Sequence, residues 1–230
     1  MHALTGFAET DRSFFARDAL EVAPQLPGCV LERTDAHGTV AIRITEVEAY
    51  AGERDPGSHS YRGKTARNAT MFGEPGHVYV YFTYGLHHAV NLVAGLAGQP
   101  YGCLVRAGRV VVGEPLARSR REHGPGVNAR RVAPLRDLDL ARGPGNVARA
   151  FGVTRADDGD DLFGGAWRFL IPDAPTGLAP ATGPRVGVSG PAGDGARFPW
   201  RFWTADDPTV SAYRPGRISR AASEREPRPR

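Results

Sequence analysis

The chain has 230 residues, of which 41% are hydrophobic and 23% charged, and its 29 Lys+Arg against 25 Asp+Glu give a formal charge of +4. This length and composition fit one folded domain or two small ones and exclude wholesale disorder. No stretch approaches about 18 consecutive apolar residues, and no basic patch followed by an apolar run opens the chain, so we expect a cytoplasmic protein with no membrane span and no export signal.

The predicted elements begin with a short helix at Asp11–Glu21, capped by Thr10 or Asp11. Two further helices are predicted at residues 114–121 and 146–151, and a surface loop at 174–183. Strands outnumber these helices and are predicted at residues 29–32, 39–50, 77–84, 89–94, 102–106, 110–112 and 168–171, with two more near 186 and 202. The pattern predicts an α+β fold, a single mixed domain over residues 1–213 with a sheet and peripheral helices.

The positive charge is unevenly placed. Residues 214–230 contain six Arg and two Glu, so this segment, predicted to be a disordered basic tail, accounts for the whole excess. Within the neutral remainder, residues 106–136 contain eight Arg and two Glu and form a basic strip that could bind phosphate. Lys64 is the single lysine.

The two cysteines, Cys29 and Cys103, are far apart in sequence and have no Cys-x-x-Cys or Cys/His spacing around them. A disulfide framework or a thiolate metal site is poorly supported, and we expect two buried thiols, each in a strand.

Paired carboxylates give the first candidate for chemistry. Strand alternation places Glu46, Glu48 and Tyr50 on the same face as Ile42 and Ile44. A carboxylate that points inward loses hydration and must be paired or share a proton, which is the environment that tunes a general base. The alternative is a strand that ends at Ile44 and leaves both Glu side chains in solvent.

The segment 75–95 predicts a hairpin with Tyr84, Leu86 and His87 at its tip. Large groups at a hairpin tip suit a wedge that enters a base stack, and tyrosines on one strand face suit a platform for an extruded base. Ordinary packing of aromatic side chains in the core is the alternative, and we expect it for Tyr79.

Two candidate phosphate sites differ in strength. The segment Arg62–Thr65, RGKT, resembles the end of a nucleotide-binding loop, but the required first glycine is replaced by Ser58 and no helix pattern follows. Gly143–Asn146 precedes a predicted helix, so the backbone amides at Gly145 and Asn146 are candidate phosphate ligands.

Several motifs together resemble the alkyladenine (3-methyladenine) DNA glycosylase family. The matching segments are TEVEAYAGERDPGSHSYRGKTARNATMFGEPGHVYVYFTYGLHHAVN, CLVRAG, RGPGNVARAFGV and GPRVGVSG, in order from about Leu26 to Trp203. The resemblance implies a single domain with a curved antiparallel sheet and no metal or other cofactor. It implies a monomer that binds double-stranded DNA containing damaged purines and is associated with the nucleoid.

The resemblance also implies roles for individual residues. Glu48 is the base that activates water, Arg106 lies beside it, and Asn91 crowds the 2-amino group of normal guanine. The aromatic groups that hold the flipped base are Tyr50, His59 and Tyr81, and Tyr84 is the intercalating residue. The tip sequence Tyr84-Gly85-Leu86-His87-His88 departs from the family, whose members more usually carry Met and further aromatic residues there.

These assignments predict a monofunctional glycosylase that leaves an abasic site, because a strand-cutting lyase needs an amine nucleophile and Lys64 lies outside the implied site. The substrates expected are 3-methyladenine, 7-methylguanine, hypoxanthine and ethenoadenine. A noncatalytic protein of the same fold that binds damaged DNA is the first alternative, and a nucleotide hydrolase that uses RGKT is the second.

Overall fold

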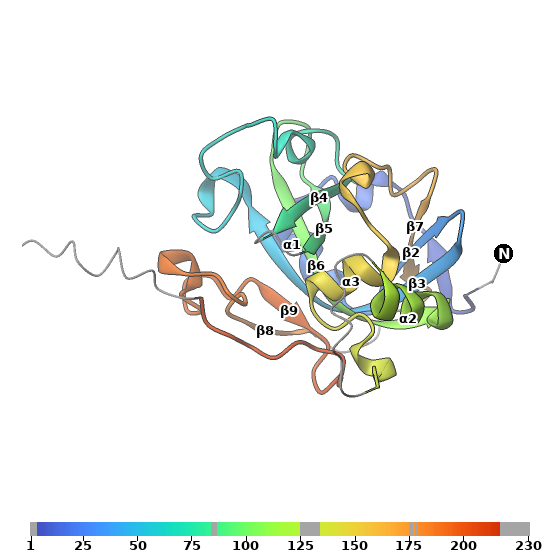
Figure 1. Cartoon of the computed structure of the whole chain (residues 1–230). Helices are drawn as coiled ribbons and strands as arrows, with labels where there is room; N and C mark the ends of the chain where they lie inside the picture. The colour runs from blue at the N-terminus through green and yellow to red at the C-terminus, as the bar shows by residue number, and fades with distance from the viewer. Residues whose placement is uncertain (1–3, 84–86, 125–133, 175–176, 178, 217–230) are drawn as a thin grey trace, which may run out of the picture.

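One antiparallel sheet organises the chain (Figure 1). The computed structural model describes residues 4–83, 87–124, 134–174, 177 and 179–216. Within these ranges the strands are β1 (Phe7–Glu9), β2 (Val30–Asp35), β3 (Gly38–Ala51), β4 (Val78–Thr83), β5 (His87–Ala94), β6 (Tyr101–Val112), β7 (Trp167–Pro172), β8 (Ala181–Gly183) and β9 (Arg201–Trp203). Their order is β1-β7-β2-β3-β6-β5-β4, and β9 joins β3 to β8. The predicted α+β class is confirmed.

The helices are short and peripheral. They are α1 (Ala19–Val22), α2 (Glu114–His123) and α3 (Pro144–Phe151), with 3₁₀ turns η1 (Arg12–Phe14), η2 (Ala23–Gln25), η3 (Gly52–Arg54), η4 (Ala69–Phe72), η5 (Asp137–Asp139), η6 (Arg155–Asp157) and η7 (Gly190–Gly193). Helix α3 buries Val147, Ala148, Ala150 and Phe151 in the main core, which also contains residues of β2 to β7. No helix in the described ranges combines the length and the apolar character needed to cross a membrane.

The structure corrects several predicted elements. The helix predicted at Asp11–Glu21 is broken, because Asp18 caps a new helix that begins at Ala19, and the carbonyl oxygens of Phe15 and Arg17 accept from the Gly95 amide instead. The two strands predicted at 102–106 and 110–112 are one strand, β6. No strand forms at Val186, since the short strand of that region is β8, within the predicted loop.

Both cysteines are free, buried thiols. Cys103 lies in β6, whereas Cys29 precedes β2 by one residue. Burial raises the pKa of Cys29 to about 12, so this thiol stays protonated and unreactive near neutral pH.

Two of the three register shifts between β3 and β6 lie next to Glu46 and decide which of the following side chains face the core. Ile44 pairs with Gly108, Glu46 with Ala107, and Val47 with Val105, so Thr45 on β3 and Arg106 on β6 have no opposite residue. An extra residue reverses the alternation and re-aims the side chains that follow. The core of the sheet therefore contains Ile42, Ile44, Val47 and Ala49, and the prediction that Glu46 and Glu48 share the face of the isoleucines is wrong.

The first residue of the predicted basic tail, Arg214, is hydrogen-bonded to the folded domain. The carbonyl oxygen of Arg214 accepts from the Gly187 amide at 2.8 Å, so the described chain is docked at this point. Residues 217–230, which make up the rest of the predicted tail, lie outside the described residues.

Candidate active site

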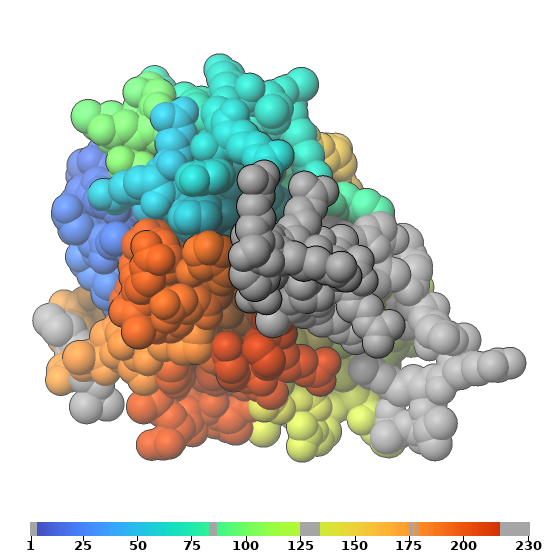
Figure 2. Space-filling view, turned by 90° about the vertical axis from the view of Figure 1, so that its left-hand side faces the viewer, coloured from blue at the N-terminus to red at the C-terminus, as the bar shows by residue number. Residues whose placement is uncertain are grey.

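A cavity of about 530 Å³ lies against the sheet on the side to which the bulges turn Tyr50. Its walls come from the ends of β3 and β6, the β4–β5 hairpin, the turn at residues 56–59 and the segment 186–189. Figure 2 shows the regions around residues 52–68 and 181–200 packed side by side on one face of the molecule. The predicted site residues that line the cavity are Tyr50, His59, Tyr81, His87, Asn91 and Arg106. The volume is within the range of about 300–1,000 Å³ typical of small-molecule sites.

Glu48 lies directly behind the cavity wall and is completely buried. Its Oε1 accepts from the backbone amide of Val186 at 2.6 Å and pairs with Arg106 Nη1 at 3.2 Å. Its Oε2 accepts from the Tyr50 hydroxyl at 2.8 Å. All three partners line the cavity, so the carboxylate is held in one orientation at its edge. The alternative in which Glu46 and Glu48 are solvated is wrong.

Glu46 forms a second buried carboxylate centre next to the first. Its Oε1 accepts from Arg106 Nε at 3.0 Å and from Arg201 Nε at 2.7 Å, and its Oε2 accepts from the Ser211 amide at 2.7 Å. Arg106 thus bridges Glu46 and Glu48. Burial opposes its charge, but the Glu48 and Glu46 carboxylates outweigh that effect and raise the pKa of Arg106.

Tyr50 connects the carboxylate to the cavity. Burial, reinforced by the Glu48 charge, raises the pKa of Tyr50 well above its ordinary value, so the hydroxyl keeps its proton and donates to Glu48. The ring is a cavity wall, as expected of a group that stacks on a base.

Three aromatic rings form the opposite part of the cavity. His59 lies 4.5 Å from Tyr81 between ring centroids, nearly perpendicular to it, and Tyr79 lies 5.7 Å from Tyr81. His59 Nδ1 is 3.3 Å from the Tyr79 hydroxyl. Burial, with the charge of Arg67, lowers the pKa of His59 and favours the neutral ring. Tyr79, predicted to be a core residue, is therefore also part of the cavity, and its position two residues before Tyr81 on one strand face is the signal that could have identified it.

Asn91 lies on β5 between the Tyr79 and Leu104 positions of the neighbouring strands. Its Nδ2 donates to the Tyr79 carbonyl oxygen at 3.2 Å, and the side chain is buried. A fixed amide at this position can obstruct a substituent on a bound base, which is the role that the resemblance implies.

His87 is not at the hairpin tip. It is the first residue of β5, lines the cavity and packs against α3 so closely that a Cβ on Gly145 would lie 2.4 Å from its ring. Tyr84 and Leu86 lie outside the described residues. Asn146 donates through Nδ2 to the Arg142 carbonyl oxygen at 2.6 Å and through its amide to Gly143 at 2.9 Å, so it stabilises the start of α3. Phosphate binding by Gly145 and Asn146 stays a prediction.

The described part of the basic strip is compensated within the protein. Arg118 pairs with Glu114 at 3.0 Å, and Arg120 pairs with Asp35 at 2.7 Å. The other described arginines of residues 106–136 bind Glu46, Asp207, Asp139 or the carbonyl oxygens of residues 139 and 140. By contrast, in the described part of the chain no ion pair forms at Arg62, Lys64 or Arg67. All three are exposed on one loop, and Arg67 lines the cavity.

The RGKT segment has no nucleotide-binding geometry. Asn68 closes the loop by donating to the carbonyl oxygens of His59 at 3.0 Å and Gly63 at 3.1 Å, and its Oδ1 accepts from the Thr65 amide at 2.6 Å. The element that follows is the 3₁₀ turn η4 and not an α-helix. A phosphate-binding loop requires a helix at this point, so the nucleotide hydrolase alternative is wrong.

Comparison with known proteins agrees with this geometry. A family model described as methylpurine-DNA glycosylase (MPG) matches residues 13–208, which include every cavity-lining residue. The chain belongs to this family. A relative from Streptomyces avermitilis is 51% identical over 208 residues, 88% of this chain and 91% of the relative, and one from Leifsonia xyli is 50% identical over 208 residues, 90% and 93%. One from Corynebacterium glutamicum is 46% identical over 200 residues, 87% and 95%. All three carry the name "Putative 3-methyladenine DNA glycosylase". As a family member, the chain is a DNA glycosylase, a DNA-binding hydrolase of base-excision repair.

Proposed function

We propose that the chain excises alkylated or deaminated purines, of the 3-methyladenine, 7-methylguanine, hypoxanthine and ethenoadenine class, from double-stranded DNA. It hydrolyses the N-glycosidic bond with a water molecule activated by Glu48 and leaves an abasic site. The observation that carries the proposal is a fully buried carboxylate held by three donors at the edge of an aromatic cavity.

Base extrusion supplies the first part of the selectivity. A damaged base pairs and stacks poorly, so its extrusion costs less than the few kcal/mol that an intact base requires. The extruded base enters between Tyr50 on one side and His59 with Tyr81 on the other. A cationic alkylated base gains a cation–π contribution there, and Asn91 obstructs the 2-amino group of guanine.

Glu48 then acts on the water. The C1′–N bond breaks with its electron pair passing to the base, and the sugar develops oxocarbenium character. The water oxygen attacks C1′ and its proton passes to Glu48, while the carboxylate stabilises the positive charge on the sugar. A cationic base needs no further proton to leave.

Exposed cations next to the cavity favour DNA as the substrate. Arg62, Lys64 and Arg67 lie on the loop between His59 and Asn68 and can contact phosphates beside the extruded nucleotide. We infer that this loop, and not the internally paired basic strip, supplies the phosphate contacts of the described residues. The enzyme would act on chromosomal DNA as a monomer, and sedimentation with a short duplex should give one protein per lesion.

The test is base release from short duplexes that each contain one of the four lesions. We expect release of at least one damaged base, with strand breakage only after alkali because Lys64 is exposed on its loop and no lysine lines the cavity. Release of none of them would refute the proposed activity, and strand breakage without alkali would refute the monofunctional assignment.

A further inference from the structure

A completely buried ion pair, Asp55–Arg185, lies behind the proposed active site and has no part in the reaction described above. Nη1 and Nη2 of Arg185 bind the two carboxylate oxygens of Asp55 at 2.6 and 2.8 Å, and neither side chain is exposed. Asp55 also accepts from the backbone amides of Gly57 at 2.8 Å and Ala51 at 3.2 Å. The pair therefore joins the end of β3 to the turn that leads to His59.

Arg185 contacts the two residues of β3 that follow Glu48, which are Ala49 and Tyr50. Its Nη1 donates to the Ala49 carbonyl oxygen at 3.0 Å, and its guanidinium lies 4.6 Å from the centre of the Tyr50 ring. The next residue, Val186, donates its amide to Glu48 at 2.6 Å. Because Arg185 is fully buried and is not a lining residue, it contacts Tyr50 from outside the cavity.

Stability alone does not account for this arrangement. Replacing a buried ion pair by apolar groups of similar volume is often neutral or stabilising, so burial of Asp55 and Arg185 is weak evidence for a stabilising role. Arg185 also leaves its Nε without a hydrogen-bond partner in the described structure, which adds a cost. What the guanidinium provides is geometry: a rigid plane that binds two carboxylate oxygens and a carbonyl while it stacks on a ring.

We propose that Arg185 is a positioning residue that fixes Tyr50, and through Tyr50 and Val186 the carboxylate of Glu48. The proposal rests on the proposed function. A lysine at this position keeps the charge but cannot bind both Asp55 oxygens, reach Ala49 and stack on Tyr50 together. Arg185→Lys should therefore misplace Glu48 and slow the chemical step more than it weakens DNA binding.

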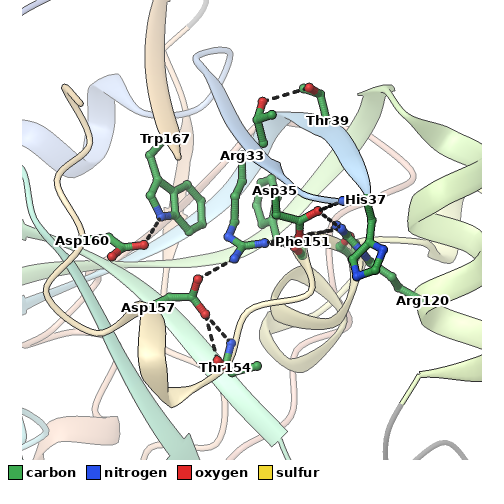
Figure 3. Close-up of polar contacts among 12 residues, drawn as sticks. Arg33, Asp35, His37, Thr39, Arg120, Phe151, Thr154, Asp157, Asp160 and Trp167 are labelled. Atoms are coloured by element: carbon green, nitrogen blue, oxygen red, sulfur yellow. Dashed lines mark hydrogen bonds and ion pairs between the residues drawn. The ribbon is translucent and has the colours of Figure 1, made fainter. Parts of the chain in front are cut away.

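Arg33 offers a matched control. It is also buried, pairs with Asp157 at 2.5 Å and Asp35 at 2.6 Å, and lies 5.8 Å from the Trp167 ring, with its Nε likewise unpartnered in the described structure (Figure 3). None of these residues lines the cavity. Arg33→Lys thus makes the same change in a similar environment away from the proposed active site.

The experiment compares the wild-type protein, Arg185→Lys and Arg33→Lys in single-turnover base release from a 7-methylguanine duplex with saturating enzyme. Affinity is measured on a duplex that contains a tetrahydrofuran abasic analogue, and folding by circular dichroism and thermal unfolding. We expect Arg185→Lys to lower the single-turnover rate about tenfold or more while affinity stays within about twofold, and Arg33→Lys to leave both within about twofold.

The outcomes separate this inference from the proposed function. An active wild type with an Arg185→Lys rate within twofold overturns the inference alone, as does an equal loss of rate in both variants at equal loss of thermal stability. A wild type that releases none of the four bases overturns both. If Arg185→Lys does not fold, Asp55→Asn takes its place in the experiment. A lower single-turnover rate with unchanged affinity supports the inference, and an unchanged rate overturns it.

Discussion

Replacing Glu48 by Gln removes the proposed base with little change of shape. The Gln side-chain oxygen can keep the Val186 amide and Arg106, and its amide nitrogen can donate to the Tyr50 oxygen once that hydroxyl rotates. Arg106 also retains Glu46 at 3.0 Å, so no buried charge is left unpaired. The variant should fold.

The expected effect on rate is large and that on stability small. Loss of a general base lowers the rate about 10²- to 10⁴-fold, which corresponds to about 2.7–5.4 kcal/mol of transition-state stabilisation. The lost hydrogen bonds to a charged group are partly replaced, so we expect a loss in the free energy of unfolding of about 2 kcal/mol or less. For a chain of this size that lowers Tm by about 4–8 °C at most.

Glu46→Gln is the control variant, for which we expect a larger effect on stability than on rate. An amide nitrogen placed at Oε2 of Glu46 would face the Ser211 amide, and one placed at Oε1 would face Arg106 and Arg201. One donor is left unsatisfied in the first orientation and two in the second, at a cost of about 1–3 kcal/mol for each. Glu46→Gln should thus lose more stability than Glu48→Gln and much less activity.

The assay is single-turnover base release from a 7-methylguanine duplex, with urea unfolding of each variant and affinity for the same duplex. If Glu48→Gln binds the damaged duplex and releases base as fast as the wild type, Glu48 is not the base, and a protein that recognises damage through another mechanism becomes the better interpretation. Equal losses of rate in both Gln variants would refute the separate roles assigned to the two carboxylates.

Four further predictions follow from other parts of the structure. Burial lowers the pKa of His59, so as pH falls below about 6.5 the unfolded chain takes up a proton at this residue before the folded chain does, and the folded state loses stability. The difference between the urea unfolding midpoints at pH 7.5 and pH 5.5 should therefore be smaller in His59→Gln than in the wild type. Gly145→Ala places a Cβ 2.4 Å from the His87 ring and should cost about 1–3 kcal/mol of stability, and an unchanged Tm would contradict that packing. Lys64→Gln should reduce the slope of log affinity against log salt by about 1 without changing the saturating rate; an unchanged slope would place Lys64 away from the phosphates. Truncation after Gly216 should weaken salt-sensitive nonspecific binding but leave base release from a short duplex at low salt intact, and abolished release would assign the tail a catalytic role.

Strand alternation and local motifs predicted much of the fold. Most strands of the sheet and helices α2 and α3 follow from short segments of the sequence, because these elements depend on neighbours within a few positions. The grouping of Tyr50, His59, Tyr81 and Asn91 was implied by the resemblance to the glycosylase family, and all four line the cavity.

The face of β3 on which Glu46 and Glu48 lie could not be predicted from strand alternation. Both carboxylates are buried, which was one of the two alternatives that the sequence left open, but the cause is not a shared face with Ile42 and Ile44. The extra residue Thr45 on β3 turns them to the other face, and their partners come from Tyr50, from β6 and from the segment 186–211. A bulge is a property of two paired strands, so the alternation of β3 alone does not reveal it.

The distribution of charge also depends partly on the sequence and partly on the tertiary structure. Sequence by itself determined that the net excess lies in residues 214–230, that Lys64 is the single lysine and that residues 106–136 are rich in arginine. Only the tertiary structure decided which cations remain available for DNA, because the acids that compensate the described part of the strip include Asp35, Glu46 and Asp207, which are distant in sequence. Ion pairs depend on distance in space, and the fold brings together carboxylates and arginines that no local pattern relates.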